Sequence, residues 1–410
     1  MPSVCAMGSL KALLKRKQQR LYYMAIKRIE IQNFKSFRHQ TIELGQFNVL
    51  IGANASGKSN FLQIFQFISD IAHHGLINAI SMQGGIEYLR NTNLAGQKDF
   101  ALKIVLDSTP EMAYEFALHF DGAGFQIEQD KLVLNPENEA SEVAVIFSTN
   151  GNIKIGNVLS ELQQDVLDKI RLIKTLKPQT LLLEQPIFRL ALTEILNDVD
   201  IFNTISVYDF DAKQSKKTVL RAGKQELETD TSNLAIVLKH ILVDQEKKRL
   251  FFNMLSYVLP FVEDIRVQPF SDNYLIITLK ETYSKVYLPT AFISDGTLNA
   301  ISLVTTLYFQ EKPLLLIEEP EKHIYPYLIS EIVDIFKDRS EEKQIIITTH
   351  ETEVIKHTDL EHILLIYRDN EGFSKICRPF EKEEVKTFLQ NDLRAEYLYT
   401  QYLLGIIDAT

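Results

Sequence analysis

The sequence predicts an α/β fold with a parallel central sheet, an antiparallel β subdomain and a largely helical insertion. Strand and helix signals alternate from Ile265 to the end of the chain, as in parallel α/β proteins. Short alternating apolar runs occur between residues 100 and 155, and helical spacing prevails over 157–262. Ligands of open α/β sheets bind at the carboxyl ends of the strands, so we expect the functional centre there.

The bulk composition is that of a globular chain and excludes several classes of protein. The chain has 410 residues, of which 45% are hydrophobic and 24% charged, enough for one large or two ordinary domains. No apolar run approaches the ~18 residues that a membrane span needs. The two cysteines, Cys5 and Cys377, cannot build a disulfide framework or a zinc cluster, which fits the cytoplasm. The net charge of -10 argues against general nucleic-acid binding, but leaves a local basic face open.

We expect the chain to divide into four segments. Residues 1–23 are basic and lack the apolar stretch of a signal peptide. Translation starting at Met24 would make them an annotation artefact, and a basic arm for nucleic acid or a partner is the alternative. An amino-terminal lobe with a phosphate loop and the β subdomain follows, then a helical insertion that acts as a lid, and then a carboxyl-terminal lobe. These three segments are residues 24–156, 157–262 and 263–410.

The expected elements follow from periodicity, taken in chain order. Two strands flank a turn-like region at 33–40, and four short strands joined by tight turns make the β subdomain. Two stretches of helical spacing come next, without repeats or sustained heptads. Three buried strands and a short helical tail at 380–410 complete the chain. The expected strands are 26–31, 47–51, 100–106, 114–120, 131–134, 143–147, 313–318, 344–348 and 362–367, and the helical stretches are 158–176 and 234–259.

The most specific motif is a glycine-rich loop between a strand and a helix. Residues 52–59 read Gly-Ala-Asn-Ala-Ser-Gly-Lys-Ser and match the pattern G-x-x-x-x-G-K-[ST]. Glycines let successive N–H groups point at one anion, and the helix N-terminus adds partial positive charge. Lys58 is expected to reach the β- and γ-phosphates, and Ser59 to ligate Mg²⁺. The nucleotide-contacting residues are Asn54, Ala55, Ser56, Gly57, Lys58, Ser59 and Asn60.

An acidic pair follows the apolar run 314–317. Glu318 and Glu319 end a buried strand and are expected beside the phosphate loop. One carboxylate can hold Mg²⁺ and the next can orient or deprotonate an attacking water. We assign Glu318 to the metal and Glu319 to the water. A solvated acidic turn is the alternative for such a pair, and the phosphate loop disfavours it.

Two further sites follow from strand and helix ends. His350 comes directly after the apolar strand 345–347, where a neutral imidazole could hydrogen-bond the γ-phosphate, although capping or packing is the common role of such a histidine. Ser294 is expected to cap a helix that starts near Gly296, which leaves exposed N–H groups for a second anion. Because this chain already has a phosphate loop, that anion would belong to a partner's nucleotide.

These motifs together resemble one family. In order and spacing they are similar to the ABC-type P-loop ATPases of the RecF, SMC and overcoming-lysogenisation-defect group, most closely the compact ATPases of bacterial defence and toxin-like operons. The resemblance covers about residues 24 to 405. It is carried by five segments, which are Ile29 to Phe37, Gly52 to Asn60, Ser294 to Thr297, Ile317 to Glu321 and Thr348 to His350.

The resemblance implies further roles. Ser294, Asp295 and Gly296 would form the signature that completes the ATP site of the opposite subunit, so that ATP joins two protomers head to tail. Lys35, Ser36 and Phe37 match the loop that approaches the nucleotide from the side. Gln83 is a candidate for the Q-loop that senses Mg²⁺ and water, and an ordinary surface glutamine is equally compatible with its flanks. Two departures are Glu318, where many ABC proteins have Asp, and Asp295, which brings negative charge close to the expected phosphate.

The expected function is therefore ATP hydrolysis with ATP and Mg²⁺ as ligands, in a cytoplasmic protein that forms an ATP-dependent homodimer. Its output is expected to be control of an effector protein encoded elsewhere, in a defence or toxin-like system. The alternative is a DNA recombination or repair ATPase that binds nucleic acid directly. The acidic charge and the lack of a nuclease domain favour the first. A membrane transporter's ATPase subunit fits less well, because the opening segment and the signature resemble the chromosome-type branch.

Overall fold

The computed structural model describes residues 25–91, 94, 99–108, 111–121, 124–134, 144–149, 152–155, 176–177, 179–196 and 200–379. The basic extension at 1–23, the helix expected at 158–176 except for its last residue, and the tail at 380–410 lie outside these residues. None of the helices in the described ranges is long and apolar enough to cross a membrane.

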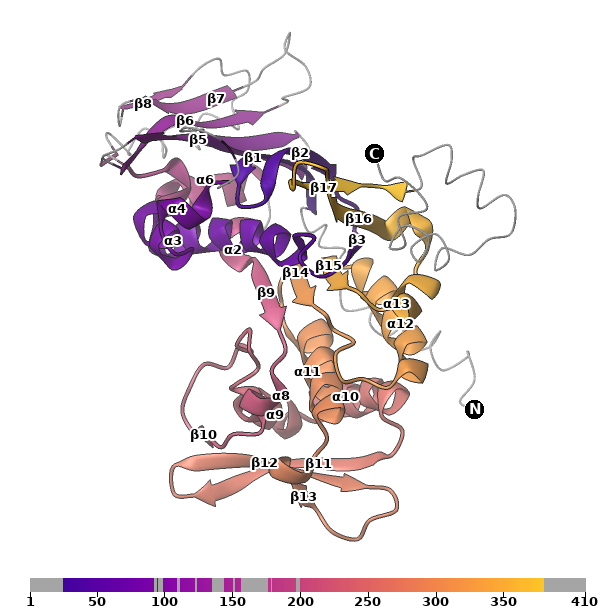
Figure 1. Cartoon of the computed structure of the whole chain (residues 1–410). Helices are drawn as coiled ribbons and strands as arrows, with labels where there is room; N and C mark the ends of the chain where they lie inside the picture. The colour runs from indigo at the N-terminus through magenta and orange to yellow at the C-terminus, as the bar shows by residue number, and fades with distance from the viewer. Residues whose placement is uncertain are drawn as a thin grey trace.

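A six-stranded sheet forms the centre of the molecule, in the order β17-β16-β3-β15-β14-β9 (Figure 1). The five strands from β16 to β9 run parallel, and β17 is antiparallel at one edge. This sheet confirms the predicted α/β core. Its strands are β3 (Phe47–Ile51), β9 (Ser206–Asp209), β14 (Leu314–Glu318), β15 (Gln344–Thr349), β16 (Ile363–Arg368) and β17 (Ser374–Cys377).

Both faces of the central sheet are buried, which explains its continuous apolar strands. Alternate residues of one strand enter two different cores. Leu316 packs with the upper core and Ile317 with the lower one, and the same division occurs between Ile346 and Ile347. The upper core lies between this sheet and an antiparallel sheet, and the lower core contains most of the carboxyl-terminal helices.

The strand β9 lies within residues 157–262, the range expected to be a helical insertion. It pairs in parallel with β14, with Val207 opposite Leu316 and Tyr208 opposite Ile317. Tyr208 is fully buried in the lower core. The range therefore supplies an edge strand of the central sheet as well as helices. A four-residue strand carries too little periodicity to be separated from helical signals on either side.

The upper part of the molecule is a seven-stranded antiparallel sheet in the order β2-β1-β4-β5-β6-β7-β8. The predicted β subdomain supplies five of these strands, and the opening hairpin β1–β2 joins them through pairing of β1 with β4. In Figure 1, α2 (Lys58–His74), α3 (Leu76–Met82) and α4 (Ile86–Leu89) lie beneath this sheet. The strands are β1 (Ala25–Phe34), β2 (Phe37–Glu43), β4 (Phe100–Asp107), β5 (Met112–Asp121), β6 (Gly124–Leu134), β7 (Ala144–Thr149) and β8 (Asn152–Ile155).

The remaining elements cover the two cores. The helices beneath the upper sheet are α2 (Lys58–His74), α3 (Leu76–Met82), α4 (Ile86–Leu89), η2 (Leu182–Glu184), α6 (Pro186–Leu196) and α7 (Ile201–Thr204). The lower part contains α8 (Ala212–Ser215), α9 (Leu234–Val243), α10 (Gln245–Val258), α11 (Asp295–Phe309), α12 (Ile329–Ser340), α13 (Thr352–Lys356) and the short helices η3 (Thr290–Phe292), η4 (Pro326–Leu328) and η5 (Leu360–His362). A small sheet closes the bottom, formed by β10 (Val219–Leu220), β11 (Val262–Ser271), β12 (Tyr274–Glu281) and β13 (Leu288–Pro289).

A buried polar network ties the upper sheet to the chain that follows it. The carboxylate of Asp130 on β6 accepts hydrogen bonds from the hydroxyl of Tyr114 at 2.8 Å and from the backbone N–H of Leu182 at 2.7 Å. Asp130 is only 1% exposed. Burial raises the pKa of its carboxyl from the ordinary 3.8 to about 7. The protonated form is therefore favoured in the folded state.

Replacing Asp130 should flatten the pH dependence of stability. Below about pH 4 the carboxyl is protonated in both states, and between about pH 4 and pH 7 the unfolded chain releases the proton first. Wild-type protein should therefore lose stability across this window, whereas Asp130→Asn has no proton to release. We expect the difference in free energy of unfolding between pH 5 and pH 8 to shrink by about 2 to 3 kcal/mol in urea titrations. Asp107→Asn, at the exposed end of β4, is the control; an unchanged pH slope in Asp130→Asn would contradict the assignment.

Candidate functional site

The phosphate loop lies between β3 and α2, as its sequence predicts. Gly57 adopts φ 115°, and a Cβ there would lie 2.2 Å from the hydroxyl of Ser374. A Cβ on Gly52 would lie 2.4 Å from the carbonyl oxygen of Ile366. Both glycines are thus required because β16 and β17 pack directly against the loop. Ser56, one of the expected contact residues, is turned inward and only 4% exposed.

Lys58 opens helix α2 and points back over the loop. Its Nζ donates to the carbonyl oxygens of Gly52 at 2.8 Å and Ala53 at 3.2 Å. Burial lowers the pKa of the ammonium, and the nearby carboxylates of Glu319, Glu318 and Glu321 oppose that shift. The Lys58 ammonium therefore lies where it would neutralise the charge of phosphate oxygens bound by the loop.

The acidic pair lies at the carboxyl end of β14, directly beside the loop. The hydroxyl of Ser59 donates to Oε1 of Glu318 at 2.5 Å. A hydroxyl and a carboxylate in contact are the donors that Mg²⁺ takes in phosphate sites. These two residues would hold the ion, which polarises phosphate oxygens when bound.

Glu319 is held by a strained backbone and by His350. It adopts φ 43°, in the left-handed region that non-glycine residues seldom occupy. Its N–H donates to the carbonyl oxygen of Thr348 at 3.0 Å. Nδ1 of His350 lies 2.7 Å from Oε1 of Glu319, and since an ionised carboxylate only accepts, Nδ1 carries the shared proton. His350 therefore orients Glu319, and any contact of its ring with phosphate would use Nε2.

The carboxyl of Glu321 links the segment that carries Glu319 to the segment that carries His350. Glu321 is 5% exposed and accepts a short hydrogen bond from the hydroxyl of Thr349, which in turn accepts from the N–H of Glu351 at 2.9 Å. Burial, with a smaller contribution from Glu319, raises the pKa of Glu321 to about 7. The contact joins the loop that carries Glu319 to the segment that carries His350.

The loop, Lys58 and the acidic pair line a cavity of about 230 Å³, whereas His350 and Glu321 stand behind Glu319 and do not line it. It brings together the loop, the cation and the acidic pair that the sequence places in one site. It also includes an arginine at the end of β16 that no motif indicated. The lining residues are Asn54, Ala55, Gly57, Lys58, Ser59, Asn60, Glu318, Glu319 and Arg368.

The chain's family is identified by a match over residues 47–356. The matching family model is described as "AAA domain, putative AbiEii toxin, Type IV TA system", and it covers more than half of the chain. The chain belongs to this family. The match confirms the predicted resemblance as far as an AAA-family ATPase domain of the toxin-like kind.

Individual relatives of this AAA-domain chain are distant. An uncharacterized protein of Methanocaldococcus jannaschii is 30% identical over 71 residues, which is 17% of this chain and 18% of that protein. The SMC head domain from Thermotoga maritima is 15% identical with a TM-score of 0.44, covering 86% of this chain and 98% of that one. The Smc head domain with an extended coiled coil bound to the C-terminal domain of ScpA, derived from Pyrococcus furiosus, is 14% identical with a TM-score of 0.48, covering 86% and 96%.

A second cavity of about 580 Å³ adjoins the first. Asn60 and Arg368 line both. Lys35 donates through Nζ to Gln63 at 2.6 Å, and burial lowers the pKa of its ammonium. Ser36 accepts from Nδ2 of Asn60 at 2.8 Å. The lining residues are Lys35, Ser36, Asn60, Gln83, Gly84, Tyr88, Arg90 and Arg368.

Several predicted residues do not line the first cavity. Ser56, Phe37 and His350 line neither cavity, and Lys35, Ser36 and Gln83 line only the second. Phe37 is 0% exposed and pairs with Phe34 across the turn between β1 and β2, so its side chain belongs to the core and not to a nucleotide site. The expectation for Phe37 is corrected, because strand alternation turns its ring inward. Gln83 lines the second cavity and not the first, where the acidic pair lies.

The three residues expected to form a signature line neither cavity. Ser294 caps α11 by accepting from the N–H of Thr297 at 3.1 Å. Asp295 forms an ion pair with Lys216 at 2.5 Å, and Lys216 lowers the pKa of that carboxyl. A Cβ on Gly296 would lie 2.2 Å from the carbonyl oxygen of His323. The helix therefore starts in close contact with the loop that follows the acidic pair.

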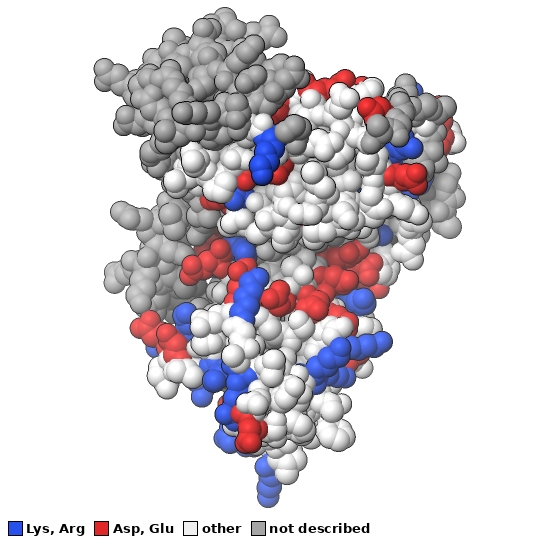
Figure 2. All heavy atoms as spheres, turned by 90° about the vertical axis from the view of Figure 1, so that its left-hand side faces the viewer, with Lys and Arg blue, Asp and Glu red and all other residues white. Residues whose placement is uncertain are grey.

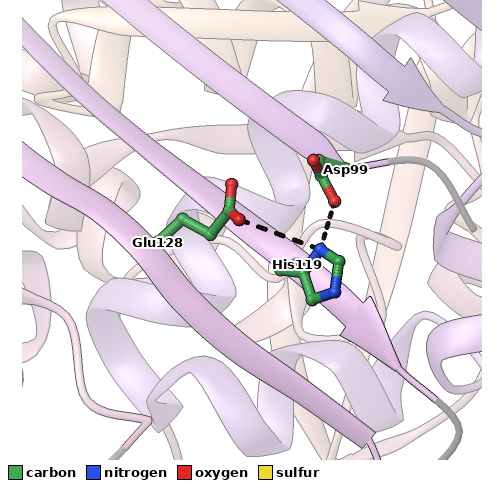
Figure 3. A group of neighbouring side chains, drawn as sticks. All are labelled: Asp99, His119 and Glu128. Atoms are coloured by element: carbon green, nitrogen blue, oxygen red, sulfur yellow. Dashed lines mark hydrogen bonds and ion pairs between the residues drawn. The ribbon is translucent and has the colours of Figure 1, made fainter.

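A separate cluster of potential metal ligands lies on the antiparallel sheet (Figure 3). Asp99, His119 and Glu128 come from three neighbouring strand segments, and Nδ1 of His119 lies 2.7 Å from Asp99 and 3.8 Å from Glu128. The hydrogen bond to Asp99 raises the pKa of His119. Each side chain is about two-fifths to half exposed, at 42% for Asp99, 41% for His119 and 49% for Glu128. An exposed ion pair accounts for this geometry without a metal.

Proposed function

We propose that this chain is an ATP hydrolase that closes as a head-to-tail dimer around ATP and reopens after hydrolysis. The observation that carries the proposal is the first cavity, where Lys58, Ser59, Glu318 and Glu319 converge on one volume. A triphosphate needs a cation and N–H donors, and hydrolysis needs a base beside the terminal phosphate. Each of these groups is supplied by a residue in this cavity.

The reaction follows from the placement of Glu319. Its carboxylate would accept a proton from a water that attacks the γ-phosphorus in line. The new P–O bond forms to that water as the bond to the β–γ bridging oxygen breaks, and ADP leaves. Lys58 and the N–H groups of the loop stabilise the negative charge of the transferring group. His350 holds the carboxylate of Glu319, the base, in position through their 2.7 Å contact.

The dimer is proposed because the chain's own signature lies outside both cavities. The N-terminus of α11 offers N–H donors that have no nucleotide phosphate in the same subunit. Three aromatic side chains close in sequence to the start of α11 and to the loop that contacts it are exposed to solvent. Phe292 is 74% exposed, Tyr325 70% and Tyr327 65%. A second copy would bury these rings and present the partner subunit's Ser294 to the γ-phosphate.

A bulky cation in place of Ser294 should prevent dimerisation and leave ATP binding intact. We expect Ser294→Arg to bind ATP within about threefold of wild type, because residue 294 lies outside the ATP cavity of its own subunit. The variant should nevertheless stay monomeric in light scattering with ATP, and its ATPase rate should fall by at least about tenfold. Ser294→Ala controls for the lost helix cap, which costs about 1 kcal/mol. A Ser294→Arg protein that dimerises with ATP as well as the alanine variant would contradict a role at the interface.

The biological output proposed is control of a partner protein in a defence or toxin-like system of the bacterial cytoplasm. The family description, with its toxin and type IV toxin–antitoxin terms, supports this over a housekeeping role. Affinity capture on the Glu319→Gln form with ATP, compared with the Lys58→Ala form, tests it. A protein partner that is retained only by the ATP-bound form is the expected result. The absence of any such partner from the native host would count against the proposal.

Direct DNA binding is the second candidate. In Figure 2, Lys and Arg side chains gather over the lower part of the face, below a band of Asp and Glu. Several basic residues of the lower elements are engaged in ion pairs, including Lys280 with Glu263 at 2.6 Å and Arg266 with Asp264 at 3.0 Å. This pairing disfavours a strong phosphate-binding surface. DNA affinity that requires ATP and falls steeply with salt would reverse the preference.

A further inference from the structure

We infer that Arg368 is a nucleotide-binding residue that contacts the α-phosphate, between the triphosphate and nucleoside ends of the ligand. The inference rests on the proposed ATP-binding function and adds a residue to it. Among the residues that line the two cavities, Arg368 and Asn60 alone belong to both. A nucleotide with its γ-phosphate at Lys58 and its base in the larger cavity must pass between these two side chains.

The guanidinium of Arg368 is held in place by the backbone. Its Nε donates to the carbonyl oxygen of Ala55 at 3.0 Å, and its Nη1 donates to that of Gly372 at 2.7 Å. Ala55 belongs to the phosphate loop, and Gly372 to the turn between β16 and β17, where it adopts φ 82°. A guanidinium has five N–H donors, so two fixed bonds leave others for a ligand. No ion pair with a carboxylate is formed by Arg368 in the part of the chain that the structure describes.

The charge of the first cavity supports the same role. The cavity contains two carboxylates, Glu318 and Glu319, and the single ammonium of Lys58 opposes them. A triphosphate adds more negative charge than Lys58 and a divalent ion held by Ser59 and Glu318 together offset, so a further cation close to its path is favoured. Lys58 serves the β- and γ-phosphates at one end of the loop. Arg368 lies beside Ala55 in the middle of the loop and lines both cavities, and a guanidinium suits bidentate contact with phosphate oxygens.

The alternative is a structural role, in which Arg368 only braces the loop through Ala55. The two roles predict different effects of losing Arg368 on the affinity for AMP, which has an α-phosphate but lacks the β- and γ-phosphates. A brace supports the part of the loop that binds the terminal phosphates, so its loss would weaken ATP and spare AMP. A direct contact with the α-phosphate would weaken both nucleotides by the same factor and leave adenosine unaffected.

The test measures displacement of a fluorescent ATP analogue by ATP, AMP and adenosine. We expect Arg368→Ala to raise the Kd for ATP and AMP alike by about tenfold to a hundredfold, the range for one charged hydrogen bond, with adenosine unchanged and partial recovery in Arg368→Lys. Arg38→Ala is the matched control, because Arg38 pairs with Glu371 at 3.0 Å in the same region but lines neither cavity.

Two results would overturn the inference. One is wild-type affinity for ATP in Arg368→Ala, and the other is a loss confined to ATP with AMP affinity unchanged. Lys58→Ala, measured in parallel, keeps the inference separate from the proposed function. If Lys58→Ala loses ATP binding while Arg368→Ala does not, only the role of Arg368 fails. If both variants bind ATP normally, the proposed nucleotide site itself is wrong.

Discussion

Glu319→Gln is expected to lower kcat for ATP hydrolysis by about a hundredfold to a thousandfold, within the range of a lost general base. The amide has the volume of the carboxyl and can still accept the hydrogen bond from Nδ1 of His350, but it cannot take a proton from water. ATP affinity should stay within about threefold of wild type, because Lys58 and Ser59 are untouched. Steady-state phosphate release and nucleotide titration measure the two effects separately.

The same variant should accumulate as an ATP-bound dimer, since hydrolysis is proposed to open the interface. Glu351→Gln is the matched control: Glu351 lies next to His350 and is 51% exposed, but it lines neither cavity. Its rate should equal that of wild type. A wild-type rate in Glu319→Gln would remove this residue from the role of base and leave the strained backbone at φ 43° without a catalytic explanation.

Lys58→Ala is expected to raise the Kd for ATP by at least about a hundredfold, since a buried cation in contact with phosphate oxygens is lost. The side chain is 7% exposed and fills the centre of the loop, so its loss also leaves the carbonyls of Gly52 and Ala53 without their donor. Equilibrium binding of a fluorescent ATP analogue measures the effect, and circular dichroism checks that the fold is retained.

The control for this variant is Lys322→Ala, which removes an exposed ammonium from the loop after the acidic pair and should bind ATP as wild type does. The expected loss in Lys58→Ala should apply to ATP and ADP alike, with adenosine affected much less. Normal uptake of ATP by Lys58→Ala would mean that the nucleotide binds elsewhere in the chain.

The local parts of the site could be predicted because each motif carries its own structural context. The strand before Gly52, the helix after Lys58 and the buried strand before Glu318 are all marked by apolar periodicity within a few residues of the motif. Parallel strands then bring their carboxyl ends to one edge, so the proximity of Ser59 and Glu318 follows from the fold class. The cap at Ser294 could be predicted for the same local reason.

The parts that could not be predicted depend on contacts between distant segments. Arg368 is the last residue of β16 and belongs to no motif, and only the parallel pairing of β16 with β3 brings it to the phosphate loop. The charge of Asp295 was expected close to phosphate, and the partner that neutralises it, Lys216, lies in a segment with no motif. Phe37 was misplaced because a family motif names a position without saying which face of the hairpin the side chain occupies.

The most direct test of the dimer is a mixing experiment with two inactive variants. Lys58→Ala lacks the loop cation and Ser294→Arg lacks a usable signature, so neither alone should form a complete site. In a head-to-tail heterodimer, one of the two sites combines Lys58 from one protomer with Ser294 from its partner. Neither variant is expected to dimerise with itself, so the dimers that form in an equal mixture should be mixed. Each mixed dimer has one intact site of two, so we expect the mixture to recover up to roughly half of wild-type ATPase activity. A mixture that stays as inactive as its components would contradict a nucleotide shared between two copies of this chain.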